Sequence, residues 1–342
     1  MRLQNILPLF VVVLLSACTS TARATLPPSS VPLQAVVSLS PTSPPTPSAT
    51  PARPSPSPSP VTATAATTPP ENTPPPTSTP TLSAPTATPT LAPDAWMNMP
   101  IVPKVSDTAR QIYQRGLAMG NHPHRFSKIG DCQNVNPFFL TVFDYPGKYR
   151  LGEKYAYLQE TIDYFHGSFS RKSLAVKGGF NVAAVLSPLR ADKTVCKPTE
   201  SPLACELRVY RPSFAIISLE QWWGHKSAES YATYMRKIVE YTISQGVVPI
   251  LATKADNIEG DNSINRAIAE IAYEYDIPLW NFWRAAHPLP NHGLKKDGFH
   301  LTFARNYFDD PERMKAAWPW RNLTALQALD AVRRGVTQKP QP

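Results

Sequence analysis

The sequence contains a thiol and an acid–imidazole pair that could together form a nucleophilic site. Cys132 directly follows Gly130 and Asp131 at the end of a short β-like run, and Asp297 and His300 lie 165 and 168 residues further on. A thiolate can attack an acyl carbon when an imidazole accepts its proton and a carboxylate orients that imidazole. Parallel sheets have their ligand-binding and catalytic residues at the carboxyl ends of strands, and Cys132 would lie at such an end. We therefore expect a Cys132, His300 and Asp297 triad for acyl transfer through a thioester.

Each part of this pattern also has a purely structural interpretation. A lone cysteine is often a small buried residue rather than a nucleophile. An Asp-x-x-His turn can hold a structural carboxylate beside an exposed imidazole. The interpretations differ in geometry, because only the catalytic one requires the thiol of Cys132 to approach the ring of His300.

The order of these residues resembles that of the SGNH or GDSL hydrolase superfamily. The first sequence block of that superfamily is Gly-Asp-Ser and its last is Asp-x-x-His; this chain has Gly-Asp-Cys at 130–132 and Asp-Gly-Phe-His at 297–300. The resemblance spans roughly residues 120–305. It implies a Cys-His-Asp triad and an oxyanion hole that includes the N–H of Cys132 and, from the second block, Gly179.

The third block of that superfamily does not match. Its Gly-x-Asn-Asp should follow the apolar run 214–219, but the chain has Glu220, Gln221, Trp222 and Trp223 there. Gln221 could supply a replacement amide, whereas Glu220 would add an anion where negative charge must develop. The tryptophans could form a stacking platform for a sugar ring or a packed rim. This departure leaves open a catalytically inactive domain that binds carbohydrate or peptide.

The first 18 residues have the features of an export signal with a lipidation site. Arg2 supplies a positive charge, and Ile6 to Leu15 form an apolar stretch too short to span a bilayer as a helix. Leu-Ser-Ala-Cys at 15–18 matches the bacterial lipobox, in which the cysteine is lipidated and becomes the mature N-terminus; an ordinary signal peptide with a chance cysteine is the alternative. We expect an exported protein that Cys18 anchors, through several acyl chains, at the outer face of the bacterial cell membrane.

Residues 19–94 have the composition of a disordered linker. They contain 21 of the 39 prolines among Ser, Thr and Ala, and four charged residues. Such a segment buries too little apolar surface to offset its chain entropy. We expect a partly polyproline II stalk that connects the anchor to a folded domain at 95–342.

The remaining cysteines predict one disulfide. Cys196 and Cys205 have eight residues between them, and an exported protein favours their pairing. A zinc site is the weaker alternative, because no Cys-x-x-Cys pair or suitable histidine spacing accompanies them. Cys132 is then the cysteine left over from the disulfide and the lipobox.

The folded part has the pattern of an α/β protein. Continuous apolar runs alternate with amphipathic segments, which predicts a mainly parallel sheet between helix layers, a three-layer α/β/α sandwich of flavodoxin-like type. Besides the strand before Cys132, we expect strands at 173–176, 214–219, 247–252 and 278–282, helices at 107–119, 155–165, 182–186, 227–244 and 263–275, and a loop at 134–149.

Charge and composition restrict the partners. Three basic and two acidic residues precede position 95, which leaves 31 and 23, a formal charge of +8, for the rest. No long basic run or nucleic-acid motif accompanies that charge, so we expect scattered surface lysines and arginines and no nucleic-acid partner. We expect a monomer without metal or cofactor, and ester or acyl groups of envelope glycans or lipids as substrates.

Overall fold

The computed structural model describes residues 91–219 and 227–338, and its described strands form one main parallel sheet. The order across the sheet is β1-β3-β4-β5, and every pairing is parallel. The strands are β1 (His122–Gly130), β3 (Pro212–Ser218), β4 (Val248–Ala252) and β5 (Leu279–Trp280). All of β3 and β4 is buried, as their continuous apolar runs predict. Gly130 is in register with Ser218, so these two strands end side by side.

The strand predicted at 173–176 is reduced to a single parallel bridge between Val176 and Gly130. The segment lies along the outer edge of β1, where Gly130 N–H donates to Ala175 O at 3.1 Å. It turns instead of extending, because the hydroxyl of Ser173 accepts the N–H of Ala175. The lateral order is therefore Val176, β1, β3, β4, β5.

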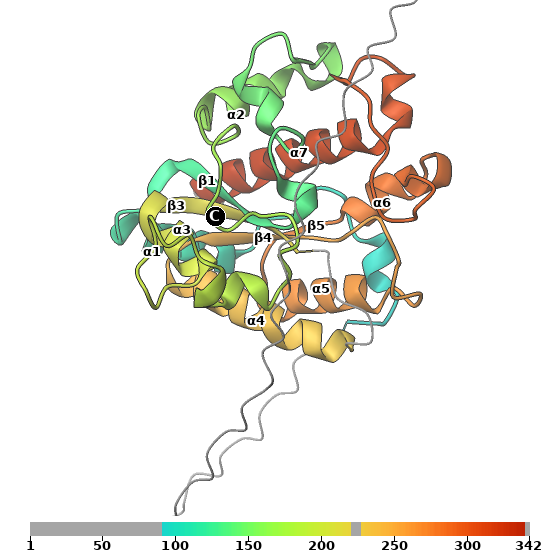
Figure 1. Ribbon diagram of the computed structural model, residues 1–342. Coiled ribbons are helices and arrows are strands. Elements are labelled where there is room, and N and C mark those ends of the chain that lie inside the picture. The colour runs from blue at the N-terminus through green and yellow to red at the C-terminus, as the bar shows by residue number, and fades with distance from the viewer. Residues whose placement is uncertain (1–90, 220–226, 339–342) are drawn as a thin grey trace, which may run out of the picture. The chain divides into compact units, whose positions relative to one another are not determined.

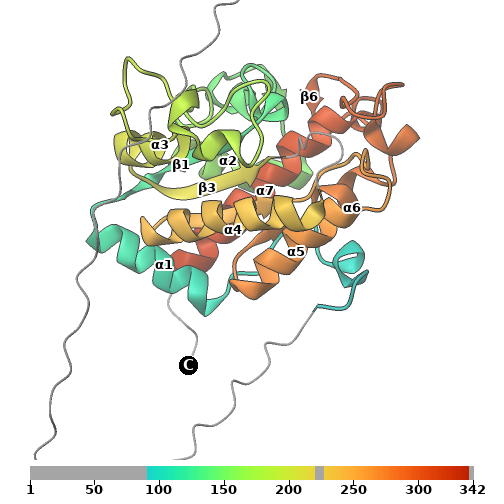
Figure 2. The same ribbon diagram turned by 60° about the horizontal axis from the view of Figure 1, so that its bottom comes forward.

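Helices cover both faces of the sheet (Figure 1). Figures 1 and 2 show α4 and α5 on one face and α7 on the other, an arrangement compatible with the expected three-layer sandwich. The α-helices are α1 (Asp107–Ala118), α2 (Gln159–Tyr164), α3 (Pro202–Tyr210), α4 (Ala228–Ser244), α5 (Ser263–Glu274), α6 (Phe282–Ala286) and α7 (Ala317–Thr337). Short 3-10 helices lie at η1 (Ala95–Asn98), η2 (Cys132–Asn134), η3 (Thr141–Asp144), η4 (Glu153–Leu158), η5 (Ala184–Leu186), η6 (Pro188–Arg190), η7 (Pro290–Gly293) and η8 (Arg313–Lys315).

Side-chain caps at their N-termini confirm where α1 and α4 were predicted to begin. The hydroxyl of Ser106 accepts the N–H of Ala109 before α1, and Ser227 does the same for Ser230 at the start of α4. After α4 the chain reverses at Gly246, whose φ is +68°. A side chain there would also collide with Gly116 of α1. Both the positive φ and this close approach therefore favour glycine at position 246.

Three predicted elements are shorter or different. Residues 155–165 form η4 followed by α2 rather than one helix. For the helix predicted at 182–186, Asn181 accepts two backbone N–H groups as a cap would, but the segment after it makes only the single 3-10 turn η5. The strand expected at 278–282 ends at Trp280, because the side chain of Asn281 accepts the N–H of Arg284 and begins α6.

A second, two-stranded parallel sheet joins β2 (Tyr149–Arg150) to β6 (Asn306–Tyr307). These two strands form a sheet separate from the main one. They connect the loop after Cys132 with the segment after His300. The predicted loop 134–149 is otherwise irregular, apart from η3.

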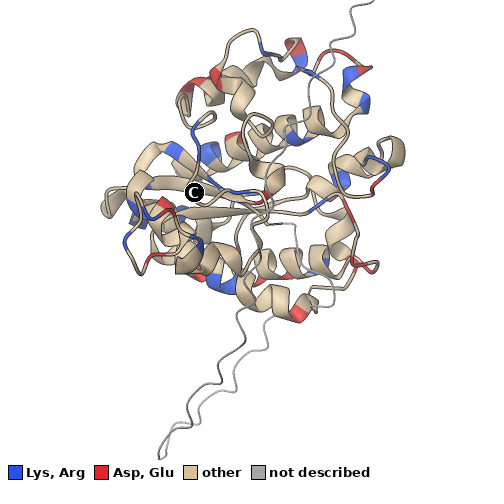
Figure 3. Cartoon of the chain, viewed as in Figure 1, with Lys and Arg blue, Asp and Glu red and all other residues tan. Residues whose placement is uncertain are grey.

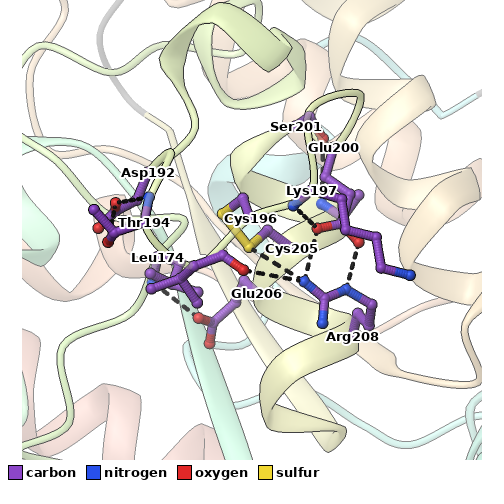
Figure 4. The surroundings of a disulfide bond; sticks show 12 residues. Leu174, Asp192, Thr194, Cys196, Lys197, Glu200, Ser201, Cys205, Glu206 and Arg208 are labelled. Carbon is purple, nitrogen blue, oxygen red and sulfur yellow. Dashed lines mark hydrogen bonds and ion pairs between the residues drawn. A yellow bond between two sulfur atoms is a disulfide. The ribbon is translucent and has the colours of Figure 1, made fainter.

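The predicted Cys196–Cys205 disulfide is present, with a Cα–Cα distance of 5.3 Å (Figure 4). Cys205 lies inside α3, which begins at Pro202 with Ser201 as its cap. Figure 4 also shows the ion pair between Arg208 of α3 and Glu200. Basic and acidic residues are interspersed over the described domain, as the composition predicted (Figure 3).

Candidate active site

The turn that carries Cys132 begins where β1 ends. The carboxylate of the buried Asp131 accepts the N–H of Gln133 at 3.0 Å, so the chain leaves the strand in an Asx-type turn. Cys132 is the first residue of η2 and is half-buried. The residue therefore lies at the carboxyl edge of the sheet, as predicted, and is not a fully buried core residue.

Asn134 fixes this turn against the neighbouring strand. Its side chain is fully buried, and its amide donates to the carbonyl of Ser218 at the end of β3 at 2.7 Å. A Cβ on Gly130 would lie 2.1 Å from that amide nitrogen. Glycine at 130 thus allows the closest approach of the amide, and the Gly-Asp pair is explained by packing and turn geometry together.

Asp297 and His300 form the predicted acid–imidazole pair. His300 Nδ1 lies 2.8 Å from Asp297 Oδ2, and Asp297 Oδ1 accepts the N–H groups of Phe299 at 3.0 Å and His300 at 2.9 Å. The backbone N–H of Phe299, then that of His300 and then its ring lower the pKa of Asp297 to about 2. An ionised carboxylate only accepts hydrogen bonds, so Nδ1 must carry the ring proton when the imidazole is neutral. Nε2 is then free of that proton and has the character of a base.

Thr302 holds the histidine turn to the start of α7. Its hydroxyl donates to Gly293 O at 3.0 Å and accepts the N–H of Ala317, the first residue of α7, at 2.9 Å. Its N–H also donates to Gly293 O, and Leu294 bridges Leu301. The Asp-x-x-His turn is therefore the tip of a short hairpin whose base is bonded to a long helix.

The Cys132 turn and the histidine turn meet in the structure. The amide of Gln133 donates to Phe299 O at 3.4 Å, a weak contact between residues adjacent to the two proposed catalytic groups. A second contact joins the same two segments, because the rings of Phe138 and Phe303 are 6.3 Å apart in an edge-to-face arrangement. A direct contact between the thiol of Cys132 and the ring of His300 stays a prediction.

The predicted oxyanion residues are located in part. Gly179 follows the bridge at Val176 by three residues; it is exposed and has a φ of +83°, which favours glycine. The third-block position, Glu220 to Trp223, lies outside the described residues. Cys18 lies outside them as well.

Two buried cations near the carboxyl edge were not predicted from the sequence. Arg321 of α7 donates to the hydroxyl of Ser218 at 2.7 Å and is fully buried. Lys254, just after β4, pairs with Asp256 at 2.7 Å and with Glu259 at 2.5 Å. Burial alone would lower the pKa of Lys254, but the two carboxylates outweigh burial and raise it. Arg321 thus contacts the last residue of β3, and Lys254 pairs with two carboxylates in the loop that follows β4.

No protein-family model matches this chain, and no curated protein matches its sequence significantly. Within 91–219 and 227–338, no three His, Cys, Asp or Glu side chains gather as a metal ion would require. None of the helices in those ranges combines the length and the apolar composition needed to cross a bilayer.

Proposed function

We propose that residues 95–342 form an SGNH or GDSL-like hydrolase domain that acts on ester or acyl groups. The observation that carries this proposal is the ionised Asp297 bonded to His300, in a turn that Gln133, the residue after Cys132, contacts. The lateral order Val176, β1, β3, β4, β5 supports it. If the segment at Val176 is counted as the second strand along the chain, this is the 2-1-3-4-5 order of flavodoxin-like sheets. Such sheets bind ligands at the carboxyl edge, where Cys132 lies.

In the proposed reaction the thiolate of Cys132 attacks the acyl carbonyl carbon. A C–S bond forms, the C–O bond to the leaving group breaks, and the imidazolium of His300 gives its proton to the departing oxygen. A water molecule then attacks the thioester as His300 takes one of its protons, and the proton returns to the sulfur as the acid product leaves. Asp297 holds the ring orientation and stabilises the imidazolium throughout. The N–H of Cys132 and Gly179 would donate to the oxyanion.

The proposal extends to location and partners. An acylated Cys18 would anchor an exported protein at the outer face of the cell membrane, and the 19–94 segment would act as a linker. Substrates would then be ester or acyl groups of envelope glycans or lipids. We propose a monomer without a nucleic-acid partner.

Thiol labelling tests the triad directly. Iodoacetamide should alkylate Cys132 faster at pH 7 than it alkylates free cysteine, because a neighbouring imidazolium stabilises the thiolate. His300→Ala should slow the labelling by about tenfold or more, whereas His166→Ala, at an exposed histidine remote from the turn in sequence, should leave it unchanged. On p-nitrophenyl acetate we expect weak turnover that Cys132→Ala abolishes.

A binding protein without catalysis is the second candidate. The observation that favours it is the sequence at 220–223, where the superfamily has its oxyanion asparagine and this chain has Glu-Gln-Trp-Trp. An unreactive Cys132, together with no turnover by the wild type or by Cys132→Ser, would exclude the hydrolase and favour a surface lipoprotein that binds carbohydrate or peptide.

A further inference from the structure

A cavity of about 280 Å³ lies beside the Cys132 turn, between η2 and the segment that pairs with the edge of β1. Asn134 and Asn136 line one side, and Lys172, Ser173 and Lys177 line the other. Lys128 of β1 also reaches it. The lining residue Asn134 is two residues from the proposed nucleophile Cys132, and the lining segment around Val176 lies on the opposite side of β1 from β3.

The lining of this cavity is positively charged. It includes three lysines, and no aspartate or glutamate is among its lining residues. Lys172 and Lys177 are exposed at the surface and form no ion pair with the carboxylates of the described residues. The walls of the cavity therefore carry positive charge only, and Asp192, which interacts electrostatically with Lys177, lies outside those walls.

Lys128 is a buried cation without a counter-ion in direct contact among the residues that the structure describes. Its side chain is 2 % exposed, and its ammonium donates to Asn136 Oδ1 at 2.8 Å, Phe169 O at 3.0 Å and Phe139 O at 3.4 Å. All three acceptors are neutral oxygens. Each hydrogen bond satisfies a donor, but none offsets the cost of removing a positive charge from water.

The charged groups around Lys128 are already engaged elsewhere. Glu206 is paired with Arg171 and also accepts the hydroxyl of Ser127, while the carboxylate of Asp144 accepts two backbone N–H groups. Burial, followed by the charge of Arg171, lowers the pKa of Lys128 to about 7, although Asp144 and Glu206 oppose the change. An anion entering the cavity would supply the missing counter-charge.

We propose that this cavity binds a compact oxyanion, a carboxylate or phosphate group carried by the molecule on which the domain acts. The last clause rests on the proposed hydrolase function; the anion site does not. Lysine ammonium groups bind such groups as point charges. Ser173 also lines the cavity; its oxygen accepts the N–H of Ala175, and its O–H can donate to an anion. The volume is at the lower end for ligand pockets, so it suits one acidic group or one acidic sugar rather than a polymer.

Calorimetric titration of the full-length protein in a non-ionic detergent tests the site. Inorganic phosphate and glucuronate are the probes, and glucose is the uncharged control, at pH 6 and low ionic strength, because salt screens exposed charges. We expect saturable binding of at least one of the two anions and none of glucose. Phosphate alone would identify a phosphate group as the ligand chemistry, and glucuronate would identify an acidic sugar.

Matched charge variants locate the binding. Lys172→Gln combined with Lys177→Gln should lower the affinity for the anion at least about tenfold, which is the effect of losing one charge-assisted contact. Lys154→Gln combined with Lys237→Gln removes the same charge from exposed positions outside the cavity and should change the affinity less than about twofold. Lys128→Met should also abolish binding. The proposal is overturned if neither anion saturates or if both double variants weaken it equally.

The same measurements separate this site from the proposed reaction. Cys132→Ala should bind the anion as the wild type does while losing turnover. If the anion binds and Cys132 is unreactive, the hydrolase proposal fails and the anion site stands. If esterase activity is found and no anion binds, only the anion site fails.

Discussion

Asp297 accepts hydrogen bonds on both carboxylate oxygens, and that explains how an exposed acid can orient a histidine. Its side chain is 49 % exposed and that of His300 is 57 % exposed, so burial contributes little to holding the two side chains together. The two backbone N–H groups at one oxygen fix the carboxylate, and the other oxygen then faces His300 Nδ1. The turn itself therefore preorganises the pair.

The lowered pKa of Asp297 predicts a specific dependence of stability on pH. A carboxyl group whose pKa is about 2 in the folded state, and roughly 3.9 when unfolded, stabilises the fold above the unfolded value. This stabilisation is lost as the pH falls through about 2. The difference in unfolding free energy between wild type and Asp297→Asn, measured by urea titration, should therefore shrink as the pH falls below roughly 4. A difference that stays unchanged between roughly pH 4 and 2 would contradict this.

Gly130 should tolerate no side chain. Gly130→Ala would place a Cβ 2.1 Å from the Asn134 amide nitrogen and force the buried asparagine away from Ser218. We expect a loss of about 1–3 kcal/mol in unfolding free energy, the usual cost of overpacking. Gly178→Ala is the matched control, because a Cβ added there would have no neighbour within 4 Å and the φ of Gly178 is not positive. Denaturant unfolding of both variants distinguishes a packing effect from the loss of any glycine.

Sequence reasoning proposed the chemical groups of the candidate site but not the residues that support them. Cys132, Asp297 and His300 are conspicuous because few residue types can act as nucleophile, orienting acid and base. Asn134 and Lys128 were missed, since a buried polar residue has no periodic signature and reveals its role only through its partners. A polar residue shortly after the proposed nucleophile was the available signal for Asn134.

At the scale of elements, α7 organises the histidine turn although the sequence pattern did not predict it. Amphipathic helices such as α4 and α5 were predicted because one face is apolar and the other polar. Helix α7 is buried nearly all round, and its buried positions include Arg321, Asn322 and Asp330, so no apolar stripe marks it. Asn322 also accepts the N–H of Leu140 and so holds the loop after Cys132. One helix thus contacts both segments of the proposed site.

The link between α7 and the histidine turn predicts the effect of Thr302→Val. Valine has nearly the same shape but neither donates to Gly293 O nor accepts from Ala317 N–H. We expect a loss of about 1–3 kcal/mol in unfolding free energy, because the Ala317 donor is left unsatisfied. Labelling of Cys132 should slow as well if His300 depends on this link.

Thr233→Val is the control for that variant. Thr233 lies on the exposed side of α4 and its hydroxyl bonds only within the helix, to Glu229 O. It should change stability by less than about 0.5 kcal/mol and leave the labelling rate unaltered. Equal effects of the two variants would mean that the hydroxyl of Thr302 has no special role.

At the scale of the whole molecule, the proposed linker 19–94 separates the proposed lipid anchor from the folded domain in the sequence. The proposed attachment is through the acylated Cys18. The 76 residues of the proposed linker, at about 3 Å each, would allow the domain to reach on the order of 200 Å from the membrane. A distant envelope glycan would then be accessible to an anchored enzyme, and a single acidic group or sugar of that glycan would be the ligand proposed for the cavity near Cys132.

Cys18→Ser should release the protein from membranes. The substitution removes the acyl acceptor, and the apolar stretch from Ile6 to Leu15 is too short to hold the chain as a spanning helix. We expect the wild type in the membrane pellet and the variant in the soluble or secreted fraction. Cys132→Ser is the matched control, because it removes a thiol without touching the lipobox and should stay in the pellet. Retention of Cys18→Ser in the pellet after washing with high salt, which screens surface charge, would show that something other than the lipid anchors this protein.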